Sequence, residues 1–289
     1  MMGQSKTSWQ AEIDSVAETI DFFRFNVKYA EEIYSRQPLS PPGNIWNTVD
    51  YRPLEGFTLA ISPFNFTAIG ANLATAPALM GNTVVWKPSD TSLYSAYLTY
   101  KLFEEAGLPS GVINFVPTSA PLINEKVLQH RDLGACVFTG STATFGKIWG
   151  TVGQNINKYK SYPRVLGETG GKNFHLVHTS AHMPTVAAQS VRSAFEYQGQ
   201  KCSALSRMFV PKSKWAELKK TMLEQVAQIK QGGPEDFSNF MSAVIDETSY
   251  NKNSKYIDIA KADKSCTIHC GGNPSSDKGW FIPPTIVET

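Results

Sequence analysis

Apolar residues recur every three or four positions near the start of the chain, a pattern typical of an amphipathic helix. The recurrence runs from Trp9 to Tyr34. It predicts a helix that begins at Ser8 and ends before Pro38, because proline cannot continue a helix interior. We assign residues 1–50 to this helix and the linker that follows it.

Beyond the linker, short apolar runs alternate with longer helical patterns. Such alternation is typical of an α/β fold with a parallel sheet and right-handed crossovers. Gly81 and Gly107 stand where two of the helices need a C-cap. The expected strands are Phe57–Ile61, Thr83–Trp86, Val112–Val116 and Cys136–Thr139, and the expected helices are Phe66–Met80, Leu93–Ala106, Pro121–His130 and one from about Thr142.

The alternation resumes in the second half and predicts a further α/β unit. We therefore divide the remainder of the chain into residues 51–170 and residues 171–289. The expected elements of the second part are strands at Phe174–Val177 and Arg207–Val210, helices at Pro184–Tyr197 and from Lys212 to about Ile229, and a final apolar run at Phe281–Val287.

Composition excludes several classes of partner. With 289 residues, 42% of them hydrophobic, the chain can bury a substantial core. The formal net charge is only +2, which does not indicate a nucleic acid or an anionic membrane surface as partner. No apolar run reaches the roughly 18 residues of a membrane span. The segment Met1–Gln10 lacks the apolar core of a signal peptide.

The 4 cysteines do not make a disulfide framework in a chain of this length and indicate a reducing compartment. Cys266, His269 and Cys270 share one strand-like segment. A zinc site needs a fourth ligand, and none stands near them in the sequence. We therefore expect no metal site.

Two motifs carry the strongest candidate chemistry. Cys202 follows Gly199-Gln200-Lys201, and a thiol in such company can be ionised and approached. Glu168 precedes Thr169-Gly170-Gly171, where a carboxylate can reach a bound substrate without crowding. Together they suggest a nucleophile and a base. Taken singly, such a cysteine is commonly a small buried hydrophobe, and such a glutamate a solvated surface charge.

A third motif, Gly140-Ser141-Thr142, follows an expected strand and opens a helix. Backbone N–H groups at such a helix start favour a phosphate, although the same residues also serve turn geometry alone. The sequence has neither a Gly-x-Gly-x-x-Gly fingerprint nor a Walker motif. A nucleotide would therefore be held in another way.

Over essentially its whole length the chain resembles the aldehyde dehydrogenase superfamily. The segments that carry the resemblance are Ser62-Pro63-Phe64-Asn65, Trp86-Lys87-Pro88-Ser89, Glu168-Thr169-Gly170-Gly171-Lys172 and Gly199-Gln200-Lys201-Cys202. The sequences of residues 61–70 and 192–202 resemble those of the delta-1-pyrroline-5-carboxylate dehydrogenase branch. The resemblance implies a Rossmann-like parallel-sheet cofactor domain at 51–170, followed by the beginning of an α/β catalytic domain at 171–289.

The resemblance also implies NAD-dependent oxidation of L-glutamate γ-semialdehyde to L-glutamate. Cys202 would attack the aldehyde, and the Asn65 amide with the backbone N–H of Cys202 would stabilise the resulting oxyanion. A hydride would pass to NAD, and Glu168 would activate the water that hydrolyses the thioester. Read from local sequence alone, Asn65 is better explained as an Asx-turn residue or as a cap of the helix that follows.

By the same resemblance, Lys87 would bond the adenosine ribose and Gly140 and Ser141 would contact the pyrophosphate. Asp90 would repel a 2′-phosphate, which favours NAD over NADP, unless it merely caps the next helix. The expected cofactor contacts are Lys87, Ser89, Gly140, Ser141, Thr142, Thr169 and Gly170. The expected substrate contacts are Ser62, Phe66 and Ser203, of which Phe66 can also be read as core and Ser203 as a turn residue.

Members of the family are longer than this chain at both ends, which raises alternatives. We expect little or no dehydrogenase activity from this polypeptide alone. The alternative function is that of a non-catalytic fragment that binds NAD weakly or pairs with full-length subunits. The resemblance implies a homo-oligomer for the full-length proteins and a mitochondrial matrix location, or otherwise a cytoplasmic one. A cysteine hydrolase is a weaker alternative, since the sequence places none of His175, His178 and His182 beside the thiol.

Overall fold

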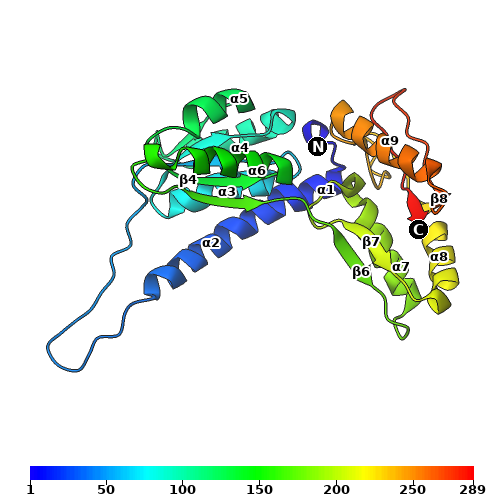
Figure 1. Cartoon of the computed structure of the whole chain (residues 1–289), viewed down its shortest axis with the longest axis horizontal. Coiled ribbons are helices and arrows are strands. Elements are labelled where there is room, and N and C mark those ends of the chain that lie inside the picture. Colours follow the sequence, from blue (N-terminus) through cyan, green and yellow to red (C-terminus); the bar gives the residue numbers. More distant parts are fainter. The chain divides into compact units, whose positions relative to one another are not determined.

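The computed structural model describes the backbone of residues 1–289 and every side chain except that of Met2. The chain forms two compact units (Figure 1). Unit 1 comprises Met1–Ala11 and Gly170–Thr289, and unit 2 comprises Glu12–Thr169. Unit 1 is therefore assembled from two stretches that lie far apart in the sequence.

Unit 2 is built on a parallel sheet of five strands in the order β3-β2-β1-β4-β5. The expected parallel α/β architecture is confirmed. Strand order changes direction around β1, so that the topological switch point lies between β1 and β4, which pair from Phe57↔Leu133 to Ile61↔Phe138. The strands are β1 (Phe57–Ile61), β2 (Thr83–Lys87), β3 (Ile113–Phe115), β4 (Leu133–Thr139) and β5 (Arg164–Glu168).

Helices cover both faces of this sheet. Because successive side chains of a strand point to opposite faces, Leu59 packs with Ile148 on one side and Ala60 with Trp86 on the other. The Ala60 face is covered by α3 (Thr67–Leu79) and α4 (Leu93–Glu105), and the Leu59 face by α6 (Thr142–Gln154) and the π-helical turn η4 (Ile123–Val127). Shorter helical turns are η3 (Asp90–Ser92), α5 (Ala120–Leu122) and η5 (Ile156–Lys158).

The expected N-terminal helix is present and changes its hydrogen-bonding pattern along the way. After the short turn η1 (Met2–Gln4), it runs as α1 (Ser8–Ala11), the π-helical η2 (Glu12–Ala17) and α2 (Glu18–Ser35). Its apolar stripe stays largely exposed, with Trp9 at 67% and Val27 at 60%, while Ala30 is buried. The periodicity thus predicts the helix correctly but does not imply that this face is covered.

Unit 1 contains two small sheets and three longer helices. Its core lies between α7 and α8, where Val186 and Val191 pack with Leu218 and Met222. Strands β6 (Asn173–Leu176) and β7 (Leu205–Phe209) pair in parallel, and β8 (Thr267–Cys270) and β9 (Ile286–Glu288) pair antiparallel. The helices are α7 (Met183–Phe195), α8 (Lys212–Val226) and α9 (Glu247–Ala262), with the 3₁₀ turn η6 (Glu196–Gly199) after α7.

Two elements are not foreseen in the sequence analysis. Strand β5 lies at the edge of its sheet and leaves Leu166 exposed, so its pattern lacks a continuous apolar run. Helix α9 buries only Ile257 among its residues, which leaves little periodic signal. The final apolar run is also shorter as a strand than expected, since only Ile286–Glu288 pairs with β8.

Candidate active site

The predicted site segments of unit 2 all leave the same edge of its sheet. Parallel strands place their carboxyl ends together, and the pairings Ile61↔Lys87, Ile61↔Phe138 and Thr139↔Glu168 set these ends at one level. Ligands of open α/β sheets bind at this edge, beside the switch point. The structure thus gathers there Ser62, Asn65, Phe66, Lys87, Ser89, Gly140, Ser141, Thr142, Glu168 and Thr169.

Asn65 lies in the turn between β1 and α3. The N-cap position of α3 is occupied by Phe66, whose side chain makes no capping bond and is 8% exposed. Asn65 therefore precedes the cap position of α3 by one residue, and Phe66 combines that position with a buried side chain.

Lys87 ends β2 with a buried side chain. Its Nζ lies 2.9 Å from Asp90 Oδ1, and the two side chains are 9% and 73% exposed. A buried ammonium needs such a partner, because an unpaired buried charge is costly. Asp90 is the first residue of η3. Ser92 occupies the N-cap position of α4, although its side chain makes no capping bond. The Asp90 carboxylate therefore pairs with Lys87 and does not cap α4.

Ser62 is engaged within the sheet. The Trp86 indole N–H donates to Ser62 Oγ at 3.0 Å, and the Ser62 backbone N–H donates to the Lys87 carbonyl at 3.1 Å. Its side chain is buried. These contacts fasten the end of β1 to the end of β2, which is a positional role.

The Gly140-Ser141-Thr142 segment forms the start of α6. The Ser141 hydroxyl caps this helix by accepting from the Thr144 N–H at 3.1 Å. A Cβ on Gly140 would lie 2.6 Å from the Phe138 ring, so glycine is required there. The Gly140 N–H donates to the Glu168 carbonyl at 3.1 Å, which ties β5 to this turn. The start of α6 is exposed, and the unpaired backbone N–H groups at the start of a helix of 13 residues favour the binding of an anion.

Glu168 is the last residue of β5 and is exposed. Its neighbour Gly167 lies against the Phe145 ring of α6, where a Cβ would overlap the ring. The boundary between the two units falls between Thr169 and Gly170. Glu168 therefore belongs to unit 2, whereas Cys202 belongs to unit 1.

In unit 1, Cys202 lies half-buried in the loop between η6 and β7. The Asn173 side-chain amide donates to the Cys202 carbonyl at 2.9 Å. A Cβ on Gly171 would collide with that same carbonyl oxygen. The glycine-rich run after Glu168 thus leaves room for the cysteine loop, a function that its sequence alone does not reveal. Ser203 is exposed in this loop.

The cysteine loop is preceded by a left-handed turn. Tyr197, Gln198 and Gly199 have φ values of 55°, 55° and 68°. For residues with a Cβ this conformation costs about 1–2 kcal/mol each. It persists only where the surroundings hold it in place. Sequence patterns contain no signal for this turn, because neither tyrosine nor glutamine is typical of it.

The first residues of the chain supply part of that hold. The fully buried Tyr197 donates its hydroxyl to the Gln4 carbonyl at 2.7 Å, and Lys6 Nζ lies 3.9 Å from the centre of the Tyr197 ring. The Gln198 side-chain amide donates to the Ser5 carbonyl at 3.0 Å. The segment before α1 is therefore a structural part of the thiol-bearing unit.

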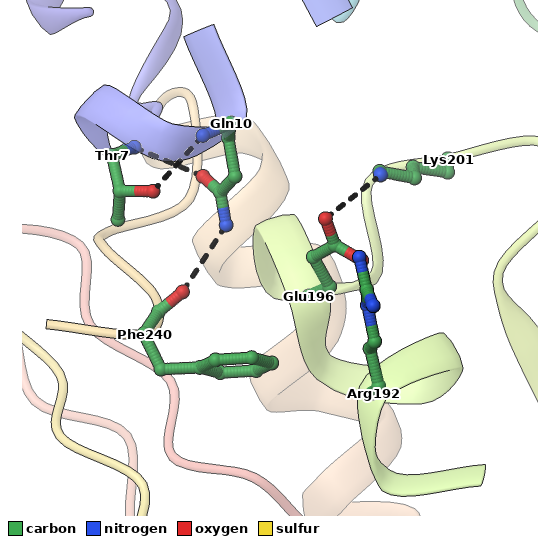
Figure 2. A network of polar contacts seen from close by, with 6 residues as sticks. All are labelled: Thr7, Gln10, Arg192, Glu196, Lys201 and Phe240. Carbon is green, nitrogen blue, oxygen red and sulfur yellow. Dashed lines mark hydrogen bonds and ion pairs between the residues drawn. The ribbon is translucent and has the colours of Figure 1, made fainter. Parts of the chain in front are cut away.

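Figure 2 shows further polar contacts of this region. Thr7 and Gln10 form a capping box, in which each side chain bonds the backbone N–H of the other at 3.4 Å and 2.9 Å, respectively. The Gln10 amide also donates to the Phe240 carbonyl at 3.2 Å. The Glu196 carboxylate forms ion pairs with Lys201, the neighbour of Cys202, and with Arg192; the N···O distances are 3.6 Å and 3.3 Å.

Other reactive side chains of unit 1 have different surroundings. The Nδ1 atoms of His175, His178 and His182 bond hydroxyl groups at 2.9, 2.8 and 2.8 Å, which gives no support to a cysteine–histidine pair. His269 bonds Glu288 at 2.6 Å, and the Cys270 thiol lies 3.7 Å from the Pro284 carbonyl. Among the described side chains, no cluster of three or more His, Cys, Asp or Glu residues is arranged to hold a metal ion.

The cysteines differ in environment. Burial in the unit 2 core raises the pKa of the Cys136 thiol to about 12, so that this thiol stays protonated at neutral pH. None of the described cysteines is in a disulfide. None of the helices in the described chain has the length and hydropathy needed to span a bilayer.

Comparison with known proteins shows the family of this chain. The model of the aldehyde dehydrogenase family matches residues 1–289. The chain belongs to this family. It is 54% identical over 295 residues to the mitochondrial delta-1-pyrroline-5-carboxylate dehydrogenase of Emericella nidulans, and 52% identical over 290 residues to the human protein of that name. Each alignment covers 100% of this chain and 51% of the relative.

A solved structure of the delta-pyrroline-5-carboxylate dehydrogenase from Mycobacterium tuberculosis, bound with NAD, matches with a TM-score of 0.96 and 50% identity. The match covers 99% of this chain and 54% of that one. This chain of the aldehyde dehydrogenase family thus spans about half the length of the curated relatives it matches.

Proposed function

We propose that this chain carries the cofactor-binding and nucleophile-bearing parts of an NAD-dependent dehydrogenase that converts L-glutamate γ-semialdehyde into L-glutamate. One observation carries the proposal: the segments bearing Asn65, Lys87, Ser141 and Glu168 end at one edge of a single parallel sheet. The identity of about half of all residues to delta-1-pyrroline-5-carboxylate dehydrogenases supports the choice of substrate.

In the proposed reaction, the Cys202 thiolate adds to the aldehyde carbon and forms a thiohemiacetal. The Asn65 amide and the Cys202 backbone N–H donate to its oxyanion, and one such donor is typically worth about 3 kcal/mol in the transition state. Loss of a hydride from the thiohemiacetal carbon leaves a thioester on Cys202, and NAD, when bound, would supply the hydride acceptor. Glu168 then takes a proton from the water that hydrolyses the thioester, which releases the carboxylic acid.

The residues of unit 2 fit a dinucleotide. The start of α6 presents Ser141 and Thr142 to a pyrophosphate, and Lys87 lies at the end of β2 to bond ribose hydroxyls. The Asp90 carboxylate beside Lys87 opposes a 2′-phosphate, which favours NAD over NADP. We assign residues 51–170 to this cofactor-binding role, with Ser89, Gly140, Thr169 and Gly170 completing the contacts.

We assign residues 171–289 to catalysis and substrate binding. Ser203 is exposed next to Cys202, which suits a contact with the α-carboxylate. Phe66 is proposed to contact the aliphatic part of the substrate. Ser62 contributes through its bonds to Trp86 and Lys87, at the rim of the pocket.

The relatives' names also motivate proposals on context. We propose a mitochondrial matrix location and a homo-oligomeric assembly for the enzyme that contains this sequence. The alternative is a non-catalytic polypeptide that binds NAD weakly or associates with longer subunits, since the chain corresponds to about half of its relatives.

An assay of NADH formation tests the function. Glutamate γ-semialdehyde, succinic semialdehyde and acetaldehyde are offered to this chain and to a version extended to the relatives' length. We expect the extended version to prefer glutamate γ-semialdehyde by at least tenfold in kcat/KM, and Cys202→Ser to abolish turnover while Cys266→Ser preserves it. Equal turnover of the three aldehydes by the extended version would refute the substrate assignment. NAD binding by the extended version without turnover would favour the alternative.

A further inference from the structure

The left-handed turn before Cys202 is held by two glutamine side chains. Gln198 bonds three backbone groups: its amide donates to the carbonyls of Ser5, at 3.0 Å, and of Ala243, and its oxygen accepts from the Ser242 N–H at 3.0 Å. Gln200 accepts from the Ile245 N–H at 2.9 Å. We call Gln198, Gln200 and the backbone groups that they bond the amide clamp.

The amide clamp coincides with the unusual backbone of the chain. Among the described residues, the non-glycine positions with positive φ are Ser5, Tyr197 and Gln198. Ser5 supplies one of the carbonyls that Gln198 bonds, and Gln4, its neighbour, supplies the carbonyl that Tyr197 bonds. Strained positions that bond one another directly indicate a turn whose shape is specified by these contacts.

The segment between the amide clamp and the Cys202 thiol is short, and its far end is also held by a hydrogen bond. Cys202 follows Gln200 by two residues, and its carbonyl is held by the Asn173 amide at 2.9 Å. The clamp therefore determines where the Cys202 loop begins, and Asn173 determines where its carbonyl lies. A nucleophile held from both sides loses little freedom when it reacts.

From this geometry we infer that Gln198 is a positioning residue for the Cys202 thiol, and that it acts by tying the turn to Ser5 and to residues 242–243. The inference rests on the proposed function in one respect, namely the reaction that the Cys202 thiol performs. The placement of the loop itself can be measured on the chain without any turnover.

The variant Gln198→Met keeps the length of the side chain and removes its three hydrogen bonds. The matched control is Asn239→Leu, because the Asn239 side-chain amide likewise donates to a backbone carbonyl of unit 1, that of Gly233 at 3.0 Å, which is not one of the groups of the amide clamp. The rates at which iodoacetamide alkylates Cys202 and Cys266 are measured in the same molecules by peptide mass spectrometry. Cys266 serves as the internal reference.

We expect Gln198→Met to raise the ratio of Cys202 to Cys266 alkylation at least fivefold, because a released loop exposes the half-buried thiol. In the extended enzyme, kcat is expected to fall at least tenfold while the Kd for NAD stays within twofold. A thiol that reacts faster with the probe but slower with the substrate distinguishes lost positioning from general loss of structure. Asn239→Leu should leave the alkylation ratio and kcat within twofold of the unaltered protein.

An unchanged alkylation ratio in Gln198→Met, or an equal change in Asn239→Leu, would overturn the inference. If Gln198→Met does not fold, Gln198→Gly decides under the same criteria, since glycine adopts the left-handed backbone without strain. Should the unaltered extended protein form no NADH while the alkylation contrast persists, the clamp stands and the dehydrogenase assignment fails. If Gln198→Met forms NADH at the unaltered rate, the dehydrogenase assignment stands and Gln198 does not position the thiol for the reaction.

Discussion

At the scale of single residues, Ser141 combines two requirements in one hydroxyl. It caps α6 through the Thr144 N–H, and it stands where we propose that the cofactor pyrophosphate binds. A cap requires only an acceptor, whereas a phosphate site also requires the absence of negative charge. The two requirements can therefore be separated by substitution.

We predict that Ser141→Asp raises the Kd for NAD at least tenfold, whereas Ser141→Asn changes it less than threefold. Both residues retain an oxygen that caps the helix, so the fold is preserved in each. Only aspartate adds a charge, and like charges about 4 Å apart repel by about 4 kcal/mol at an effective dielectric constant near 20. Isothermal titration with NAD measures both values. Equal affinities for the two variants would remove α6 from the cofactor site.

At the scale of elements, the short β8–β9 pair is fastened by a polar cluster on its surface. Trp215, His269 and Lys219 surround the Glu288 carboxylate and lower its pKa to about 2. His269 Nε2 lies at 2.6 Å and Lys219 Nζ at 3.3 Å. The Trp215 indole N–H has no partner at hydrogen-bond distance among the described atoms, so we regard it as a nearby dipole and assign the hydrogen bonding to His269 and Lys219.

This cluster predicts a dependence of stability on pH. A carboxyl whose pKa is lower in the folded state than in the unfolded state stabilises the fold above its unfolded pKa of 4.5. That contribution is lost as the pH falls from 4.5 toward about 2. We expect Glu288→Gln to lower the urea midpoint at pH 7 and to match the unaltered chain below pH 2. A constant difference between the two proteins at all pH values would contradict this origin.

Local patterns predict those elements that bury an apolar face of their own. The strands Phe57–Ile61 and Thr83–Lys87 and the helix Thr142–Gln154 follow from the sequence for this reason. The edge strand β5 and the helix α9 bury too little to be recognised. Their positions depend on neighbours that a local reading does not include.

The site divides in the same way. A position at the carboxyl edge of the sheet is predictable for Lys87, which directly follows an apolar run, and for Ser141, which follows the expected strand Cys136–Thr139 after Gly140. The partners of Tyr197 and Gln198 are not predictable, because Gln4 and Ser5 are separated from them by 193 residues. A left-handed backbone at non-glycine residues also contradicts local preference, and only tertiary contacts can explain it.

At the scale of the molecule, unit 1 is closed by the first residues of the chain. Gln4, Ser5 and Gln10 each bond a residue that lies between Tyr197 and Phe240. At about 1 kcal/mol for each bond, their removal should cost unit 1 about 3 kcal/mol. Unit 2 should be affected little, since its boundary begins at Glu12.

We therefore predict that deletion of residues 1–10 speeds amide hydrogen exchange at residues 197–204 at least tenfold. The amides of β1 and β4 serve as the reference within the same molecule and should retain their protection. Mass spectrometry of peptic peptides measures both regions at once. Equal acceleration in the two regions would show that the chain responds as one cooperative body.

The split composition of unit 1 imposes an order on synthesis. When the ribosome has released residues 12–169, every strand of the five-stranded sheet is available, and that half can fold while translation continues. Gln4 and Gln10 have emerged even earlier, yet the groups that they bond belong to Tyr197 and Phe240, which are made only after the sheet. Unit 1, which bears the nucleophile, therefore cannot complete its folding before residues 197–240 have been made, and a nascent chain that stalls earlier carries a folded sheet and an N-terminal segment without its bonding partners.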